Sequence, residues 1–510
     1  MNKLDYKNQL KQEFGFIDDL YNYFTCKQFS LVKENGILSY ITSNTFFTIQ
    51  SKLNMRKLLQ SKYIKEIIVT PKAFNALVDT SIFIVKNIDK EKYKLKFIDT
   101  SKCSIDEYYN LEQACNKEIY EIDINLYRDN LDNVFFIPDK INMQIYEKII
   151  PKTKELYDIW KDKICGSDKI KKNEKMISKY INKNIKQGSI TLLGLITDGG
   201  VGLQTGNNGK FLGVREGTKS AESTKIERVE KFYKNIIKNK NNKIIFEREY
   251  PNYLGINSKK DVKDFLNSLS EYEIRNIFDN LKELIERDVF GQGYIFKIIN
   301  EIEIKNVEDM TEYEKLNGID DDEKVYVSYD KGDKEGNRWY LETPFYINWS
   351  TQSVDELRTS KKARWQGYDF YFREGFCWSD INTIYLKSRI KDKSIHDVKS
   401  MSLFSKLDEA IISEKYFVAM INSKFISEFT SNFYNNTSTF QINDGRRIPI
   451  IIPTREQLKY INNLVDQAIE IKKLQFNKSI TKEKAEVELQ KIQAKIDEFV
   501  YKLYDIKLED

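Results

Sequence analysis

Four short apolar runs within residues 1–100 constrain the fold of this chain more than any other feature. Each has the length and the apolar character of a buried strand. Helical patterns lie at residues 17–35 and near residues 53–60. Strands and helices that alternate in this way are typical of a mostly parallel sheet, so we expect an α/β domain. The four runs are GILSYIT (36–42), IKEIIVT (64–70), SIFIVKN (81–87) and KLKFIDT (94–100).

Composition excludes several classes of protein. The chain has 510 residues, enough for two or three domains, and its 41% hydrophobic content excludes a largely disordered protein. The formal net charge of +5 is weakly basic, so it permits a nucleic-acid partner without arguing for one. The polar start is not a signal peptide, and no apolar run approaches the roughly 20 residues of a membrane span. We therefore expect a cytoplasmic protein with no membrane partner.

Residues that bind metals are scarce or poorly spaced. The five cysteines show no CxxC spacing, which argues against a zinc site or a disulfide framework. His396 is the only histidine, which excludes a histidine nucleophile and a multi-histidine metal site. Asp288, Glu303 and Lys305 have the order of a metal-dependent nuclease core, but such patterns arise by chance in a chain with 31% charged residues. We expect no metal site.

The rest of the chain divides by composition. Residues 101–190 read as a charged helical connector, and the glycines concentrated in residues 192–214 mark a domain boundary. Residues 191–454 form the next expected domain. Two apolar stripes at helical spacing in residues 455–510 predict an antiparallel helix pair joined near residues 477–482.

Four segments in the first part of the chain carry a family resemblance. Together they resemble the second half of the catalytic domain of DNA adenine-N6 methyltransferases. The resemblance implies a partial Rossmann-like methyltransferase sheet in residues 1–100, base flipping, and S-adenosylmethionine as the cofactor of the family. The segments are DLYNYF (19–24), GILSYITSNTFF (36–47), NMRKLL (54–59) and AFNALVDTSIFI (73–84).

The same resemblance places three residues in a base pocket. Phe74 aligns with the aromatic that stacks on the flipped-out adenine, a contact that restores part of the lost stacking energy. Asn44 and Thr45 are implied to line that pocket. Two plainer interpretations stay open: Phe74 as a core aromatic, and Asn44 and Thr45 as loop or cap residues.

The motifs that carry the reaction in this family have no counterpart here. No (N/D/S)PP(Y/F) tetrapeptide occurs in the 510 residues, and no Gly-rich loop follows a strand that ends in an acid. The resemblance thus implies a chain that starts just after the NPPY loop. We expect no complete catalytic set, no binding of S-adenosylmethionine by this chain alone, and no methylation without the missing half. That half is either a separate polypeptide or lost by truncation.

A glycine-rich segment, GGVGLQTGNNGKFLGV (199–214), resembles the start of the target-recognition region of type IIG restriction–modification enzymes and of PglX of the BREX phage-defence system. The resemblance implies that Thr205, Asn207, Asn208 and Lys210 contact double-stranded DNA. Glycines also let a backbone approach a phosphate closely. An ordinary turn-rich hairpin is the alternative.

Two further segments extend this resemblance. FYFREGFCWSDI (370–381) resembles the same regions, with Arg373 as a candidate DNA contact. Residues 417–461 are similar to the end of a recognition domain in type I specificity subunits, and Arg446 and Arg447 are candidates to reach phosphates or guanine edges. The whole resemblance implies an α+β target-recognition domain in residues 191–454, followed by a C-terminal helical hairpin.

Three basic runs, at residues 171–186, 231–243 and 361–364, either follow phosphates or form solvated faces in a Lys-rich chain. Three functions remain. The first is the recognition and base-pocket part of an adenine methyltransferase in a restriction–modification or phage-defence system. The second is a non-enzymatic DNA-specificity subunit, and the third a metal-dependent nuclease.

Overall fold

The structure is a computed structural model. It describes residues 8, 11–13, 19–72, 79–110, 117–164, 167–287, 289–290, 296–321, 323–333, 335–379 and 385–508.

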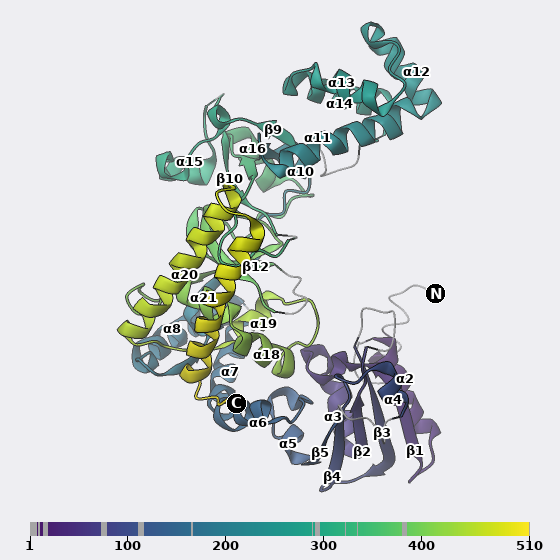
Figure 1. Ribbon diagram of the computed structural model, residues 1–510, viewed down its shortest axis with the longest axis vertical. Helices are drawn as coiled ribbons and strands as arrows, with labels where there is room; N and C mark the ends of the chain where they lie inside the picture. The colour runs from purple at the N-terminus through teal and green to yellow at the C-terminus, as the bar shows by residue number, and fades with distance from the viewer. Residues whose placement is uncertain are drawn as a thin grey trace.

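A five-stranded sheet lies in the N-terminal part of the chain, in the order β1-β3-β2-β4-β5 (Figure 1). All four predicted strands are confirmed, but the prediction of a mostly parallel sheet is wrong. β3 runs antiparallel to β1 and to β2, β5 runs antiparallel to β4, and only β2 and β4 are parallel. The strands are β1 Ile37–Ser43, β2 Lys62–Val69, β3 Thr80–Asp89, β4 Lys94–Asp99 and β5 Glu118–Asp123.

The length of one connection explains this difference. Only residues 70–79 separate β2 from β3. A parallel pair needs a crossover of about a dozen residues or more, usually a helix, so β3 returns antiparallel beside β2. The sheet also extends to β5, beyond residue 100 and into the expected helical connector. Helices α2 (Leu20–Leu31), α3 (Leu53–Ser61) and α4 (Ile105–Tyr109) accompany it.

The largest hydrophobic core joins this sheet to the end of the chain. It runs from Phe47 and Phe135 to Phe433 and Ile461, all buried. A short antiparallel pair of strands, β6 (Ile190–Leu192) and β15 (Pro449–Ile451), also links distant segments. The surrounding helices are α5 (Asn125–Arg128), α6 (Lys140–Lys148), α7 (Ile150–Ile164), α8 (Ser167–Asn184), α17 (Glu414–Asn422) and α18 (Lys424–Phe433).

A second, eight-stranded sheet has its own core. Its order is β7-β14-β12-β13-β10-β11-β8-β9, and Trp349 and Ile395 are buried beside it. The strands are β7 Thr197–Gly200, β8 Leu212–Arg215, β9 Lys297–Ile299, β10 Tyr326–Asp330, β11 Phe345–Asn348, β12 Arg373–Ser379, β13 Ser388–His396 and β14 Ser400–Ser405. The helices nearby are α9 (Leu193–Ile196), α10 (Asn208–Phe211), α15 (Glu312–Asn317), α16 (Thr351–Thr359) and α19 (Ile442–Arg446).

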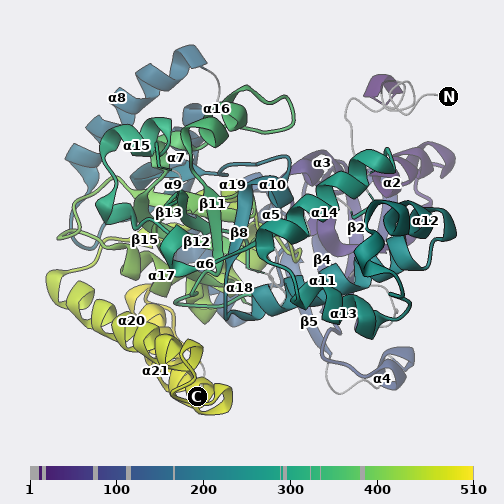
Figure 2. The same ribbon diagram turned by 90° about the horizontal axis from the view of Figure 1, so that it is seen from above.

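Four helices form an arm with a third core. They are α11 (Lys219–Phe232), α12 (Lys240–Glu249), α13 (Lys259–Asn267) and α14 (Glu271–Leu284). Figures 1 and 2 show this arm and the five-stranded sheet projecting to the same side of the body.

The chain ends in two long helices that lie side by side, α20 (Arg455–Phe476) and α21 (Lys482–Leu503). Thr454 and Gln457 cap the first of them with reciprocal hydrogen bonds. Most residues of the predicted stripes are buried, for example Ile461 and Ile496, but Val487 is 52% exposed. In the part of the chain that the structure describes, every helix is too short or too polar to cross a membrane.

One buried ion pair ties the C-terminal segment to the region that follows the five-stranded sheet. The Nη2 of Arg447 donates to the Oδ2 of Asp132 over 2.8 Å, and the two side chains are 2% and 5% exposed. The guanidinium lies 4.7 Å from the ring of Tyr157 and 4.2 Å from the ring of Tyr434. A charge so enclosed needs its partner, because desolvation is costly for an unpaired ion.

Replacing Arg447 by Ala is expected to lower the free energy of unfolding by about 3–5 kcal/mol, because the buried carboxylate of Asp132 then keeps only the more distant Lys161, at 4.0 Å, as an ion partner. Urea unfolding followed by circular dichroism measures the change. The matched control is Arg455→Ala at the exposed start of α20, with an expected effect within about 0.5 kcal/mol. Equal effects of the two variants would contradict the role given to the pair.

Candidate nucleic-acid interface

The loop that follows β1 holds two of the predicted base-pocket residues. It comprises residues 44–50 and begins with a short 3-10 turn, Asn44–Phe47. The Oγ of Ser43 accepts a hydrogen bond from the backbone N–H of Thr45, which starts the turn. The hydroxyls of Tyr21 and Thr45 lie 3.0 Å apart. Asn44 and Thr45 are thus neighbours on an ordered, half-buried loop.

Arg56 of α3 fixes the inner side of this loop. Its Nη1 donates to the carbonyls of Phe46 and Ile49, at 2.9 and 2.7 Å, and its Nε donates to the carbonyl of Asp132 at 2.9 Å. Arg56 is fully buried. The rigid fork of a guanidinium suits this use, because one side chain satisfies three carbonyls in fixed directions.

Asn436, nearly 400 residues further along the chain, fixes the outer side. Its Nδ2 donates to the backbone carbonyl of Asn44 at 2.9 Å and to the Oδ1 of Asn44 at 3.2 Å. The Oγ1 of Thr48 donates to the Oδ1 of Asn436, and the N–H of Asn436 donates back to that Oγ1, both at 2.9 Å. The loop is therefore held in place by the half of the chain expected to recognise DNA.

The remaining predicted pocket residue, Phe74, lies outside the described residues. The roles of Phe74, Asn44 and Thr45 toward a base therefore stay predictions. The structure adds that the side-chain oxygen of Asn44 already accepts a hydrogen bond from Asn436. Any contact of Asn44 with a base would compete with this bond or share it.

The glycine-rich segment lies between two other parts of the chain, near His396 and near residues 362–364. The N–H of Leu203 donates to the carbonyl of His396 at 2.9 Å. Gln204 and Arg364 exchange two backbone hydrogen bonds, at 2.8 and 3.2 Å. A Cβ on Gly202 would lie 1.8 Å from the carbonyl oxygen of His396, and one on Gly206 2.5 Å from that of Lys362. The glycines thus permit close backbone packing within the protein itself.

Two residues predicted to contact DNA from this segment have internal partners. Thr205 is 3% exposed, and its Oγ1 donates to the Oδ1 of Asn208 over 2.5 Å, so Thr205 does not reach the surface. The Oδ1 of Asn207 caps α10 by accepting from the N–H of Lys210. Only Lys210 is exposed among these four, and its Nζ pairs with Glu356 at 2.6 Å.

Of the three arginines predicted to contact DNA, one is exposed. Arg373, at the start of β12, lies on the surface with its guanidinium 5.3 Å from the rings of Phe370 and Phe404. Arg446 is half-buried, its Nη2 donates to the carbonyl of Gly199 at 2.6 Å, and burial lowers the pKa of its guanidinium. Arg447 is buried in its ion pair with Asp132, so its guanidinium is not on the surface.

Several of the predicted segments come together on one flank of the eight-stranded sheet. The glycine-rich segment pairs with residue 364, and Gly367 approaches Gly202, while Arg373 follows on the same stretch. The cations exposed along this stretch are named here the basic flank: Lys361, Lys362, Arg364 and Arg373.

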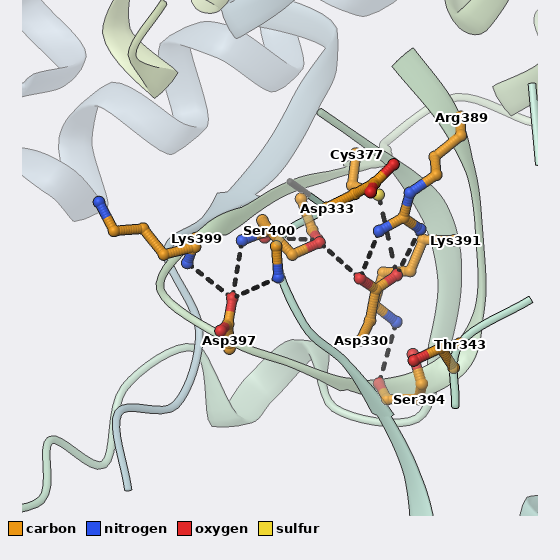
Figure 3. Close-up of polar contacts among 12 residues, drawn as sticks. Asp330, Asp333, Thr343, Cys377, Arg389, Lys391, Ser394, Asp397, Lys399 and Ser400 are labelled. Carbon is orange, nitrogen blue, oxygen red and sulfur yellow. Dashed lines mark hydrogen bonds and ion pairs between the residues drawn. The ribbon is translucent and has the colours of Figure 1, made fainter. Parts of the chain in front are cut away.

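A buried polar network supports the basic flank (Figure 3). Two guanidinium nitrogens of Arg389 donate to the carboxylate of Asp330 at 2.6 and 2.7 Å, and the Oγ of Ser400 donates to the same carboxylate at 2.8 Å. The Nζ of Lys391 donates to the carbonyl of Arg373 at 2.8 Å. The backbone that carries an exposed cation is therefore anchored to a buried group of hydrogen-bonded charges.

Burial shifts the pKa of the charged groups in this network. Burial alone would raise the pKa of Asp330. The nearby Arg389 guanidinium has the larger opposite effect and holds the pKa of Asp330 below its usual value. Burial lowers the pKa of Lys391 to about 8 and that of His396 to about 3. His396 packs edge-on against the rings of Tyr371 and Phe404, an environment that favours the neutral imidazole.

The glycine-rich segment is not an open cofactor loop. The carbonyls of His396 and Lys362 occupy the space beside Gly202 and Gly206. The helix after this segment, α10, has only four residues. No group of three or more His, Cys, Asp or Glu side chains able to hold a metal occurs within the described ranges. Glu303 pairs with Lys297 and Lys305 with Glu314, while Asp288 lies outside those ranges.

Four residues of this region could not be identified from sequence: Asn436, Arg56, Asp132 and Tyr157. Two features of the sequence indicate that Asn436 and Arg56 are unusual, but neither feature indicates a contact. Asn435, Asn436 and Thr437 form a turn-prone cluster, and Arg56 sits among the apolar residues that α3 buries. Neither signal names a partner, because each contact joins segments far apart in the chain.

Comparison with known proteins gives a partial match. Residues 1–75 match the family model described as Eco57I restriction-modification methylase. Among solved structures, the chain is similar to the type IIL restriction-modification enzyme MmeI in complex with DNA (10% identity, TM-score 0.39) and to the type IIG restriction endonuclease BpuSI (10% identity, TM-score 0.25). Each alignment covers 99% of this chain and 52% of the other, so the chain spans about half the length of either enzyme. A search of curated proteins found no match.

Asn436→Ala is expected to release the loop at residues 44–50 without unfolding the protein. The variant removes the Asn436 side-chain bonds to Asn44 and Thr48, so the backbone amides of the loop should exchange hydrogen about tenfold faster. Hydrogen–deuterium exchange with mass spectrometry reads this directly. Asn443→Ala, at an exposed position, is the control. Unchanged exchange in the Asn436 variant would show that the loop holds itself.

His396 is expected to remain neutral well below pH 6. Its pKa lies near 3 when folded and at 6.5 when unfolded, so its imidazole NMR signals should not titrate between pH 8 and 5. The same signals should titrate near pH 6.5 in urea. Because the unfolded chain takes up the proton first, the stabilisation from His396 is complete above pH 6.5 and declines as pH falls. A titration near 6.5 in the folded protein would show that the ring is solvated.

Proposed function

We propose that this chain is the DNA-recognition and base-pocket part of a site-specific adenine-N6 DNA methyltransferase. The observation that carries the proposal is the match of residues 1–75 to a restriction-modification methylase model. That range contains the loop at residues 44–50 and Phe74. A methylase-related role for these residues is supported by the match, and the base-facing roles of Phe74, Asn44 and Thr45 are part of the proposal.

The proposal assigns the recognition of double-stranded DNA to residues 191–454. The basic flank supplies exposed cations for phosphates, and Asn207 and Asn208 lie beside it. Arg446 supports the same face through the carbonyl of Gly199. Thr205 and Arg447 are left out of this surface because both side chains are buried. Asn436 then connects recognition to the base-pocket loop.

The proposal also includes a partner polypeptide with the cofactor loop and the NPPY motif. The outer edge of β1 has no strand beside it among the described residues. Apolar side chains next to that edge are exposed, including Phe24 at 59%, Leu31 at 73% and Ile37 at 58%. An open edge with exposed apolar side chains favours association with further strands. Methylation would then require both parts, with S-adenosylmethionine held by the partner.

The biological setting in the proposal is a restriction–modification or phage-defence system, PglX-like in the second case. A non-enzymatic DNA-specificity subunit is the alternative. It is favoured by one observation: the buried network beneath the basic flank is formed by hydrogen bonds among residues of this chain. The nuclease interpretation gains no support, because Glu303 and Lys305 are held in separate ion pairs.

A methylation assay separates these functions. The chain is incubated with unmethylated genomic DNA and labelled S-adenosylmethionine, with and without a polypeptide that carries the cofactor loop and NPPY motif. We expect label in adenine only in the mixture, because the chain alone lacks the NPPY acceptors. Label with the chain alone would contradict the proposed incompleteness. Specific DNA binding without label in the mixture would favour the specificity subunit, and no DNA binding at all would contradict both.

A further inference from the structure

One short segment of the helical arm carries a dense positive charge. Residues 231–243 contain five lysines and no acidic residue, so the segment carries a formal charge of +5. The basic run at residues 171–186 has the same formal charge, but it contains an acidic residue, Glu174. We name this segment the lysine elbow. It comprises the end of α11, a π-helical turn at Tyr233–Ile237 and the start of α12.

The arm has a core that fixes the direction of these lysines. Phe232, Ile236, Ile237 and Phe246 are buried, and Phe232 packs edge-on against Phe246. Since these apolar residues face inward, the side chains between them face outward. Lys234, Lys238 and Lys240 are accordingly exposed.

The remaining two lysines are engaged in ion pairs along their own helices. Lys231 pairs with Glu227 at 3.0 Å, and Lys243 pairs with Glu247 at 3.5 Å. Lys238 lies 5.4 Å from the ring of Tyr233, which does not neutralise its charge. The elbow therefore presents three cationic side chains on an ordered turn, and no carboxylate lies between them in the sequence.

The elbow lies at the end of the arm, away from the eight-stranded sheet. α11 packs beside β8 and leads outward, with α12 at the far end (Figures 1 and 2). The helical stretch from Lys219 to Ile237 is about 28 Å long at 1.5 Å per residue. That length equals about eight base pairs of B-DNA at 3.4 Å each. The arm and the unit that carries the base-pocket loop project to the same side.

We propose that the lysine elbow is a sequence-independent phosphate-binding site that grips duplex DNA outside the recognised sequence. The inference rests on the proposed function for the path of the DNA along the basic flank. An exposed ammonium on a flexible stem neutralises a phosphate and releases counterions without reading a base. The arm thereby adds affinity for long duplexes and leaves sequence choice to the eight-stranded sheet.

The test is a salt titration of binding to a labelled 40-base-pair duplex of mixed sequence, measured by fluorescence anisotropy on the full chain. The elbow variant is Lys234→Gln with Lys238→Gln and Lys240→Gln. Each lost phosphate contact lowers the slope of log affinity against log salt by about 0.9, so the slope should fall by about two to three. The three positions are exposed, and circular dichroism verifies that the variant is folded.

Two matched variants make the result specific. Lys484→Gln with Lys491→Gln and Lys495→Gln removes the same charge from exposed positions of α21 and is expected to leave the slope unchanged. Lys361→Gln with Lys362→Gln and Arg364→Gln tests the basic flank. If the salt slope of the elbow variant equals that of the α21 variant, this inference is overturned. Loss of binding in the flank variant would at the same time leave the proposed function intact. No DNA binding by the wild type would overturn both.

Lysine acetylation footprinting gives an independent measurement. Saturating duplex is expected to protect Lys234, Lys238 and Lys240 from acetylation several-fold and to leave Lys484 and Lys495 reactive. Equal reactivity of the elbow with and without DNA would contradict the proposed contact.

Discussion

The buried pair of Arg447 and Asp132 is the interaction on which the rest of this structure depends. It closes a chain of contacts in which Gln50 donates to the hydroxyl of Tyr157 at 2.8 Å and Tyr157 donates to Asp132 at 3.2 Å. Arg56 adds a bond to the carbonyl of Asp132 and holds the loop at residues 44–50. The position of that loop is thus set by residues from both ends of the chain. Since unpaired buried charges are costly, the two halves are held in one arrangement.

The eight-stranded sheet is also held by buried charged groups, but several hydrogen bonds share the work there. Its charged groups at Asp330, Arg389 and Lys391 are buried and hydrogen-bonded, so they shape the backbone and do not themselves meet solvent. The glycines at 202 and 206 let three segments pack at backbone distance. The basic flank and the lysine elbow at the end of the arm carry the exposed cations to which the proposed function assigns DNA contact. Rigid placement of few charges favours binding because little side-chain and loop order has to be gained.

Local patterns in the sequence were sufficient for several elements, although they missed β5 in the expected helical connector. The four apolar runs became β1 to β4, and the two stripes near the C-terminus became α20 and α21, since periodicity reports directly on burial. The predicted direction of the strands was wrong because direction depends on the length of the connection, and the link between β2 and β3 is short. The ion pair of Arg447 could not be predicted because its partner, Asp132, lies 315 residues away in the sequence. The contact of Asn436 with the loop at residues 44–50 could not be predicted for the same reason.

A structure of the full chain bound to a duplex tests the central claim most directly, namely that one face carries both the DNA path and the base-pocket loop. The account predicts phosphates within hydrogen-bonding distance of Lys361, Lys362 and Arg373, with the loop at residues 44–50 facing the same duplex and Asn436 still bonded to it. Duplex bound on another face, with the basic flank left in solvent, would contradict it.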